Sequence, residues 1–472
     1  MGKFNDYSKA TSLLGDETLL VLQNGAVKRA SVEELMSASP NNMGVYPDVP
    51  LNRVTIKRFV NQDSTQVVTT DNLGMIDKIF SLFFPCLIDR NSRIVAYLNG
   101  KDVTKTVDGL PATLDDYTMQ AMVRIGGFWM KYEYDAITNT KIEKYSIYKV
   151  RGYKYVRRRF FPMYGGVMET QGGKELLLSN ANKWTTQNRN IVAYHTAAKN
   201  LGDNFRAIAL QDYNIYRKMF FLWKKDYNSQ KFYDITGFDW NKWYATPNPD
   251  SEANTNNCCQ LYKTGITNSI LGMEGKMDAQ TFTYADGSTK TFNPYKFLWA
   301  EGFLSGPYWI RTTGALKQNH KWYVAKDINT CTSFSIDDNH EYICDAPKTN
   351  GWIYEDFEDT MFPSALGASD SKGLCDHFWT NETDTTSVFI PLVVGSANNG
   401  SYIGCSCLNS NNGVSNTNPN NGSALTFCLN CSIQRKEFFF FIRTVEILIC
   451  IVTTSSNHTN CRLSSDRYWT AI

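Results

Sequence analysis

A short acidic run holds the side chains best suited to acid–base chemistry. It consists of Glu355, Asp356, Glu358 and Asp359. Two carboxylates at a fixed separation can share the acid and nucleophile roles of glycoside hydrolysis, and a cluster of carboxylates can bind calcium. A solvated acidic edge is the simpler interpretation, because charged side chains are mostly exposed. The run alone therefore predicts no active site.

Other catalytic and metal-binding signatures are missing from the sequence. It contains no GxSxG elbow, no Walker loop, no HExxH pair and no GxGxxG at a strand-to-helix junction. Cys428 and Cys431 form one CxxC without the second pair that a zinc site needs, so we interpret the cysteines as buried or free thiols. The histidines also lack metal-ligand spacing, and they are His195, His320, His340, His377 and His458. We expect a protein that is not an enzyme and that holds no metal and no cofactor.

A basic and aromatic stretch, residues 149–160, resembles in composition a surface that contacts phosphates and stacks bases. A strand offers another interpretation, because its exposed charges would protect a sheet edge from aggregation. The 48 basic and 46 acidic residues leave a net charge of +2, which gives no overall field toward nucleic acid or an anionic membrane. We therefore expect no nucleic-acid partner. The basic residues of the stretch are Lys149, Arg151, Lys154, Arg157, Arg158 and Arg159.

The most unusual segment is residues 388–424, which contains no Lys, Arg, Asp, Glu, His, Gln, Met or Trp over 37 positions. Nine asparagines lie between Asn398 and Asn421. Side-chain amides donate and accept hydrogen bonds in turns, so an Asn-rich backbone can be ordered without helix or strand. Apolar runs at 389–394 and 424–427 flank the segment like two strands. We predict a rigid platform of loops.

The glycines and asparagines of this segment resemble the variable segment of phage tail proteins that are diversified by retroelements, the major tropism determinant-like proteins. The stretches 362–367 and 376–379 are similar to the residues that precede the variable segment in that family. Residues 301–309 resemble a turn in the core of its fold. Residues 11–35 are similar to the short attachment module of phage tail fibres. The resemblance covers about residues 1–427. It implies a C-type lectin fold and a receptor-binding surface rewritten by adenine-directed mutagenesis, and the composition of 388–424 agrees with such rewriting of Asn codons.

The resemblance implies two sets of positions in the segment. The variable, receptor-binding positions are Ser396, Ala397, Ser401, Tyr402, Cys405, Cys407, Ser410, Gly413, Val414, Thr417, Pro419 and Asn421. The scaffold positions are Gly395, Gly400, Gly404, Asn409, Asn411, Asn412, Ser415, Asn416 and Gly422. Tyr402 is the one large anchor, since tyrosine offers amphipathic area with few rotors.

Two helices and many strands must position this segment. A helical stripe at 191–201 ends at Gly202, and a second helix has Asp212 as its expected N-cap and an aromatic seam from Tyr216 to Tyr227. Strands are expected at 18–22 and over 94–150, and loops with short strands after 230. The expected fold class is α+β: a C-type lectin-like domain with two helices, a small irregular sheet and long ordered loops.

The predicted domains are a tail-attachment module (1–45), a β-rich connector (46–170), the receptor-binding domain (171–427) and an extension of unknown role (428–472). The resemblance implies a phage tail fibre adhesin in the virion that forms a homotrimer and binds a protein or glycan receptor on the host cell. It also implies contact with other tail proteins through the first module. A surface-glycan depolymerase is the alternative function. No apolar stretch is long enough for a membrane span.

Overall fold

The computed structural model describes the backbone of β1 (Thr18–Gln23) and β2 (Ala26–Ser31), and residues 45–59, 67–247, 260–328 and 333–427. The predicted extension 428–472 lies outside the described residues. The described residues divide into two units, the β1–β2 pair and residues 45–427. In the first unit the two strands are antiparallel, with Thr18 opposite Ser31. This pair confirms the strand predicted at 18–22.

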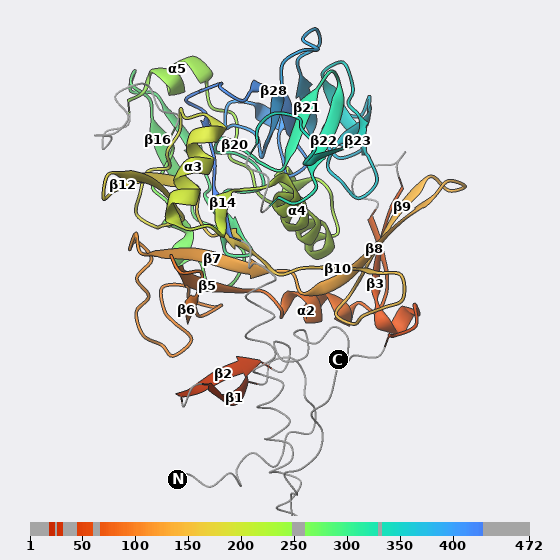
Figure 1. The fold of residues 1–472 in the computed structure, drawn as a ribbon. Coiled ribbons are helices and arrows are strands. Elements are labelled where there is room, and N and C mark those ends of the chain that lie inside the picture. The colour runs from red at the N-terminus through yellow and green to blue at the C-terminus, as the bar shows by residue number, and fades with distance from the viewer. Residues whose placement is uncertain are drawn as a thin grey trace, which may run out of the picture. The chain divides into compact units, whose positions relative to one another are not determined.

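Two antiparallel sheets contain most strands of the first third of the second unit (Figure 1). The five-stranded sheet has the order β10-β8-β9-β3-β4, and the six-stranded sheet has the order β14-β30-β11-β7-β5-β6. Strands of the first are β3 (Val54–Phe59), β4 (Val67–Asp71), β8 (Phe128–Asp135), β9 (Thr140–Ser146) and β10 (Lys154–Val156). Strands of the second are β5 (Phe84–Asp89), β6 (Ile94–Tyr97), β7 (Met119–Ile125), β11 (Arg159–Pro162), β14 (Phe205–Ala207) and β30 (Leu425–Phe427).

A ten-stranded sheet forms the opposite side of this unit (Figure 1). Its main path is β23-β22-β21-β27-β28-β26-β24-β25, and β20 pairs with both β27 and β29. Two of its pairings are parallel, β26 with β28 and β20 with β29. The strands are β20 (Trp309–Arg311), β21 (Ala315–Gln318), β22 (Lys321–Ala325), β23 (His340–Asp345), β24 (Gly351–Asp356), β25 (Pro363–Leu366), β26 (His377–Thr380), β27 (Phe389–Val393), β28 (Leu408–Gly413) and β29 (Asn421–Gly422).

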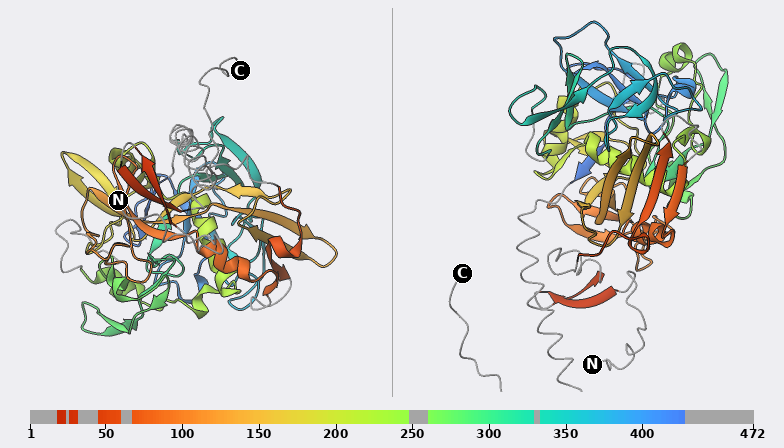
Figure 2. Two further views of the ribbon diagram at one scale, coloured as in Figure 1. Left: turned by 90° about the horizontal axis from the view of Figure 1, so that it is seen from below. Right: turned by 90° about the vertical axis from the view of Figure 1, so that its right-hand side faces the viewer.

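Smaller elements complete the unit (Figure 2). Three short sheets pair β12 with β13, β18 with both β15 and β19, and β16 with β17. Their bounds are β12 (Val167–Gln171), β13 (Lys174–Leu178), β15 (Gly275–Lys276), β16 (Gln280–Thr283), β17 (Thr289–Phe292), β18 (Tyr295–Phe297) and β19 (Ala300–Glu301). The short helices are α2 (Gly74–Phe80), α5 (Trp240–Ala245), η2 (Pro50–Asn52), η3 (Ser229–Lys231), η4 (Ile266–Ser269) and η5 (Gly400–Tyr402).

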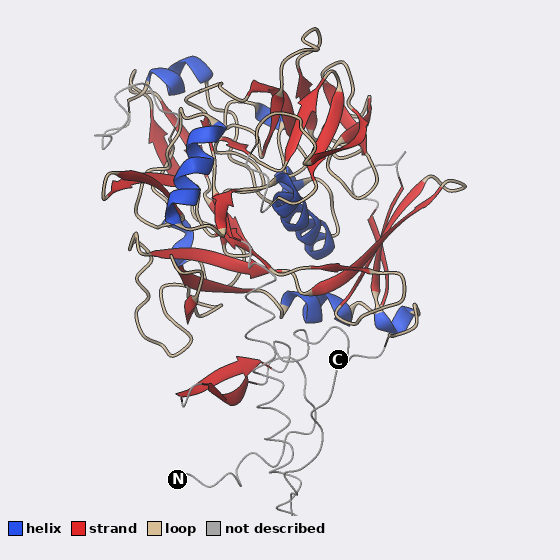
Figure 3. Ribbon diagram, viewed as in Figure 1, coloured by secondary structure: helices blue, strands red, loops and turns tan. Residues whose placement is uncertain are grey.

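The two predicted helices are confirmed as α3 (Ile191–Leu201) and α4 (Leu210–Lys224), shown in blue in Figure 3. Asn190 caps α3 by accepting a hydrogen bond from the Ala193 amide, and Gly202 follows its last turn as predicted. The predicted N-cap of the second helix is wrong. Asp212 lies in the first turn of α4, where its carboxylate pairs with Arg206 at 2.8 Å and Arg159 at 2.9 Å.

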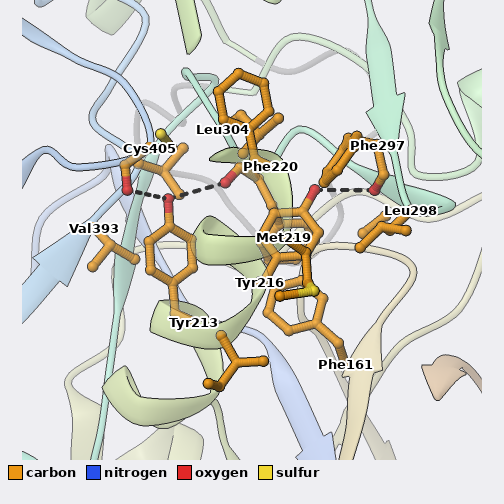
Figure 4. Packing of buried hydrophobic residues seen from close by; sticks show 14 of the residues in the cluster. Phe161, Tyr213, Tyr216, Met219, Phe220, Phe297, Leu298, Leu304, Val393 and Cys405 are labelled. Carbon is orange, nitrogen blue, oxygen red and sulfur yellow. Dashed lines mark hydrogen bonds between the residues drawn. The ribbon is translucent and has the colours of Figure 1, made fainter. Parts of the chain in front are cut away.

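Helix α4 lies in the core of the unit, and its aromatic side chains contact both sheet layers (Figure 4). The Tyr216 ring stacks on Phe161 of β11, with 4.3 Å between ring centroids. Tyr213 donates a hydrogen bond from its hydroxyl to the carbonyl oxygens of Phe303 at 3.1 Å and Cys405 at 3.2 Å. A buried phenol needs such a partner, so the helix fixes the backbone of the Asn-rich segment from below.

The α+β fold class expected from the sequence is wrong. Among the described residues 38% lie in strands and 14% in helices, so the protein is β-rich with several sheets. The two helices exist, and most of the short strands expected among the loops after residue 230 belong to a ten-stranded sheet and two smaller ones, not to one small irregular sheet. Neighbouring strands in the sheets stabilise the extended backbone of these segments, and the residue preferences of the segments themselves do not reveal it.

The predicted domain limits stay predictions, although the strand pairing crosses one of them. Within the six-stranded sheet, Phe160 of β11 pairs with Phe427 of β30, and these two residues come from either side of position 170. The same sheet also contains β14, which follows the predicted limit. The predicted connector and receptor-binding regions therefore share a sheet.

Candidate binding surface at the asparagine-rich segment

The Asn-rich segment, residues 388–424, is folded into the ten-stranded sheet. Strand β28, with the sequence LNSNNG, pairs with β26 on one side and β27 on the other. Asparagine and glycine are poor strand formers, so these two neighbours rather than local preference hold the backbone extended. The segment contains strands β27, β28 and β29 of this sheet, joined by loops and by the short helix η5.

Two glycines of the predicted scaffold permit close backbone approaches. Gly395 has φ +87°, and a Cβ atom there would lie 2.2 Å from a methyl carbon of Ile403. At Gly404 a Cβ atom would lie 2.2 Å from the Asp376 carboxylate. A larger residue at either position would displace its neighbour, so these glycines fix the path of the chain.

A chain of side-chain amides orders the second half of the segment. Asn409 accepts a hydrogen bond from the Asn411 backbone amide at 2.9 Å, and Asn412 donates to the Asn411 side chain at 2.6 Å. Asn418 in turn donates to Asn412 at 3.3 Å. Such local bonds replace regular secondary structure in loops. The amides therefore act on the backbone as well as presenting polar groups.

The buried guanidinium of Arg311 supports the same loops from within. It is fully buried, and it donates a hydrogen bond to the Asn416 side chain at 2.9 Å. Burial lowers its pKa to about 10. A charged group without water depends on the amide oxygens around it, so Asn416 has a structural role.

The structure buries half of the predicted variable positions. Their side chains cannot contact a partner in this conformation. Cys405 and Cys407, which the resemblance placed on the receptor-binding surface, are buried free thiols. Burial raises the pKa of the Cys405 thiol well above its usual range. The buried positions are Ser396, Ala397, Cys405, Cys407, Ser410 and Asn421. The exposed ones are Ser401, Tyr402 and Thr417, and Gly413, Val414 and Pro419 are partly exposed.

Five of the nine predicted scaffold positions are buried. Gly395, Gly404, Asn409, Asn412 and Gly422 are buried, whereas Gly400 and Asn416 are partly exposed. Asn411 and Ser415 are exposed. The sheet does not cover these two scaffold positions, so their side chains are accessible to a partner.

Four rings meet at the surface beside this segment, and we call Trp352, His377, Trp379 and Tyr402 the aromatic platform. Tyr402 is 46% exposed, and the other three rings are partly exposed. The Tyr402 ring stacks on Trp352 with 5.1 Å between centroids and an interplanar angle of 24°. It meets His377 edge-on at 5.2 Å, and His377 lies 4.4 Å from Trp379. The platform is one continuous aromatic surface.

Strand pairing places these rings side by side. His377 lies opposite Trp352 in the β24–β26 ladder. Side chains alternate between the two faces of a strand, so Trp379 of β26 lies on the same face as His377. Buried Trp309 supports the platform from below, with its ring perpendicular to Trp379 at 5.3 Å. The alternation at 377–379 is a sequence signal that could have revealed two of these residues. No local signal links Trp352 to Tyr402, because the pairing of distant strands creates that contact.

Backbone hydrogen bonds hold Tyr402 over the strands. Its amide donates to the Asn399 carbonyl at 3.4 Å, and the Asn399 side chain accepts from the Ser396 amide at 3.0 Å. The Gln230 side chain donates to the Ser401 carbonyl at 2.7 Å. The anchor side chain is therefore pre-positioned, which lowers the entropy cost of a contact.

A buried carboxylic acid lies beneath the platform. Asp376 accepts a hydrogen bond from the Ser406 amide at 2.6 Å, and burial raises the pKa of Asp376 to about 8. Burial also lowers the pKa of the neighbouring His377 to about 4, so its imidazole is neutral near pH 7. The platform presents no charge of its own at neutral pH.

A polar cleft of about 250 Å³ is connected to the segment through Gln230. Gln230, which binds the Ser401 carbonyl, lines it together with Asp234, Lys276, Lys290 and Asn293. Burial raises the pKa of Asp234 despite the two lysines. The cleft offers donors and acceptors directly beside the platform.

Asp356 departs from the solvated edge expected of the acidic run, whereas Glu358 is exposed and Glu355 and Asp359 are partly exposed. Asp356 is buried, and its carboxylate pairs with Lys141 at 2.7 Å, Arg58 at 2.9 Å and Arg217 at 3.1 Å. Although burial opposes it, these cations hold the pKa of Asp356 well below its usual range. The carboxylate cannot act as an acid, and it instead links β24 with α4 and the five-stranded sheet.

The basic stretch fits a sheet edge. Lys154 is exposed on β10, which ends the five-stranded sheet. Tyr153 is buried, with its hydroxyl donating to Asp48 at 3.0 Å, and Arg159 pairs with Asp212. These contacts favour the structural interpretation of the stretch over stacking with bases.

Within residues 45–427, as far as they are described, no group of three or more His, Cys, Asp or Glu side chains is placed to hold a metal ion. The described helices include none that is both long and apolar enough to cross a membrane.

No protein-family model matches the chain, and no curated protein sequence is similar to it.

Proposed function

We propose that the protein is a receptor-binding protein, an adhesin, that attaches to a cell surface through the aromatic platform. The observation that carries the proposal is the position of Tyr402. This exposed tyrosine of the Asn-rich segment packs against three partly exposed rings from two strands. Clustered tyrosine and tryptophan side chains with ordered amides beside them are typical of binding surfaces.

The contact surface in this proposal is smaller than the predicted one. It consists of the platform together with the exposed and partly exposed positions of the segment. Those positions are Ser401, Gly413, Val414, Thr417 and Pro419, with Asn411 and Ser415 beside them. A change at these positions leaves the buried frame intact, so the surface tolerates diversification.

The resemblance of residues 388–424 to variable phage tail segments supports a host cell as the target. In this proposal the protein is part of a phage tail fibre in the virion, and residues 1–45 attach it to other tail proteins. Three copies at a fibre tip would raise avidity by about 10² to 10⁴ without a new contact. Modest affinity at each site then suffices for adsorption.

The geometry favours binding over catalysis. Asp356 is held by three cations, His377 is neutral, and Asp234 is the single carboxylate among the residues that line the cleft. Hydrolysis of a glycoside needs two carboxyl groups across the scissile bond. We therefore do not propose the depolymerase alternative as a second function.

Binding of the fluorescently labelled full chain to a panel of bacterial cells tests the proposal. Tyr402→Ala should weaken binding at least tenfold, because a central aromatic anchor contributes about 2 kcal/mol or more. Tyr342→Ala is the matched control, since Tyr342 is 49% exposed on β23 of the same sheet and makes no ring contact with the platform. Equal binding of both variants, with native near-UV circular dichroism, would reject the platform as the contact surface.

A further inference from the structure

We propose that the group bound by the aromatic platform is a neutral glycan, with a pyranose ring lying against the indole and phenol rings and a chain that continues into the polar cleft. This inference rests on the proposed function and narrows it to one receptor class. It depends on four features of the surface: its rings, its amides, its lack of charge and the neighbouring cleft.

The rings offer apolar area to a ligand with apolar C–H groups. Trp352, Trp379 and Tyr402 are all partly open to solvent, and buried Trp309 keeps the Trp379 ring in place. An aromatic face carries partial negative charge, which attracts polarised C–H groups of a sugar ring. The stacked Trp352 and Tyr402 rings form the centre of this area.

Amides and hydroxyls lie at the margin of the rings, where sugar hydroxyls would be. Asn411 is exposed on β28, two residues beyond Asn409, which pairs with Trp379 across the β26–β28 ladder. Ser401 is exposed beside Tyr402, and Asn398 and Asn399 are partly exposed. An amide donates and accepts at once, so it can pair with a hydroxyl of either orientation.

The aromatic platform and the Asn-rich segment lack the charges that would select an ionic partner, and in the cleft Asp234 lies together with Lys276 and Lys290. The whole segment 388–424 contains no ionisable side chain of Lys, Arg, Asp, Glu or His. His377 adds none at neutral pH because burial disfavours its charged form. A polyanionic glycan or a strongly charged peptide would lose its hydration shell without an opposite charge in return.

The cleft extends the site beyond one sugar ring. Gln230 joins the two regions, because its side chain lines the cleft and donates to the backbone of Ser401, next to Tyr402. Asp234 and Lys290 offer an acceptor and a donor inside the cleft. A ligand with hydroxyls along its length can use both regions, so an oligosaccharide should bind more tightly than a monosaccharide.

The test has an array arm and a cell arm. In the array arm, the full chain is applied to immobilised neutral and acidic bacterial polysaccharides. We expect neutral members to bind, with little change as salt rises from about 0.05 M to about 0.5 M. Tyr402→Ala and Trp352→Ala should lose at least tenfold in affinity, Tyr402→Phe should retain most of it because the ring remains, and Tyr342→Ala should bind like the parent. Exclusive, salt-sensitive binding to acidic polysaccharides would overturn the inference.

In the cell arm, bacteria are treated with periodate, which cleaves sugar diols, or with protease before binding is measured. Loss after periodate and retention after protease supports the glycan. Loss after protease with retention after periodate overturns the glycan and leaves the adhesin function in place. Binding to no cell of the panel, with binding on the array retained, overturns the adhesin function alone.

Discussion

Replacement of Asp356 by asparagine removes the one anion that joins three buried cations. The side chains of Lys141, Arg58 and Arg217 are 5%, 6% and 1% exposed, and that of Asp356 is 9% exposed. They come from β9, β3 and α4, so the carboxylate connects the five-stranded sheet with the central helix and with β24. In Asp356→Asn the three cations remain buried and repel one another.

The size of the effect follows from the geometry. At an effective dielectric constant of about 20, two unit charges about 4 Å apart attract by about 4 kcal/mol, so three contacts give about 12 kcal/mol of gross attraction. Much of this attraction is offset, because burial of a carboxylate costs free energy and the variant buries no carboxylate at this position. Measured losses for breaking a buried ion pair are about 3–5 kcal/mol, and we expect Asp356→Asn to fall in this range.

Urea unfolding followed by tryptophan fluorescence measures the loss. Asp286→Asn is the control, because the Asp286–Lys242 pair is equally short at 2.9 Å but 49% and 43% exposed. An exposed pair contributes about 0–1 kcal/mol. The pKa of Asp356 in the folded state lies below its ordinary value of 3.8. Its contribution to the free energy of unfolding is therefore present above pH 3.8 and is lost as the pH falls. The stabilities of the variant and the parent should accordingly converge in acid. A loss for Asp356→Asn no larger than for Asp286→Asn would refute the reasoning.

Three further predictions concern the support of the platform. Burial raises the pKa of Asp376 in the folded state from 3.8 to about 8. The carboxyl group therefore contributes fully to the stability of the fold below pH 3.8, and this contribution is lost as the pH rises toward 8. Asp376→Asn should therefore gain stability relative to the parent between pH 6 and pH 9 in urea titrations, and a constant difference would contradict this. Gly404→Ala should destabilise the protein by about 1–3 kcal/mol through overpacking against Asp376. Gly413→Ala is the control, because neither glycine has a positive φ and a Cβ at Gly413 would meet only the Val388 carbonyl oxygen at 3.8 Å. Cys405 should react with iodoacetamide in urea but hardly at all in the native state, as mapped by mass spectrometry, and rapid native labelling would show that the segment is not packed as described.

Local sequence periodicity predicted the helices but not the overall architecture. The stripe from Ile191 to Leu201 and the aromatic seam at Tyr216 and Phe220 repeat with the helical period, and this signal depends on neighbours along the chain. The strand LNSNNG at 408–413 has no such signal, because its pairing with β26 and β27 determines its conformation. The assembly of the short strands after position 230 into a ten-stranded sheet therefore could not be predicted from residue preferences.

The candidate site was predictable to the extent that it lies on one segment. Composition drew attention to residues 388–424 and to Tyr402, whose exposure agrees with its expected place on the surface. The burial of Cys405 and the ion pairs of Asp356 depend on residues far away in sequence. The same is true of Trp352, which reaches Tyr402 only through the β24–β26 pairing.

Hydroxyl-radical footprinting of the full chain bound to cells tests the central claim most directly. We predict that binding protects Trp352, Trp379 and Tyr402 from oxidation, while Tyr342 on the same sheet is oxidised as in the free protein. Unchanged oxidation of the three platform residues, with protection at another surface, would contradict the assignment of the binding site.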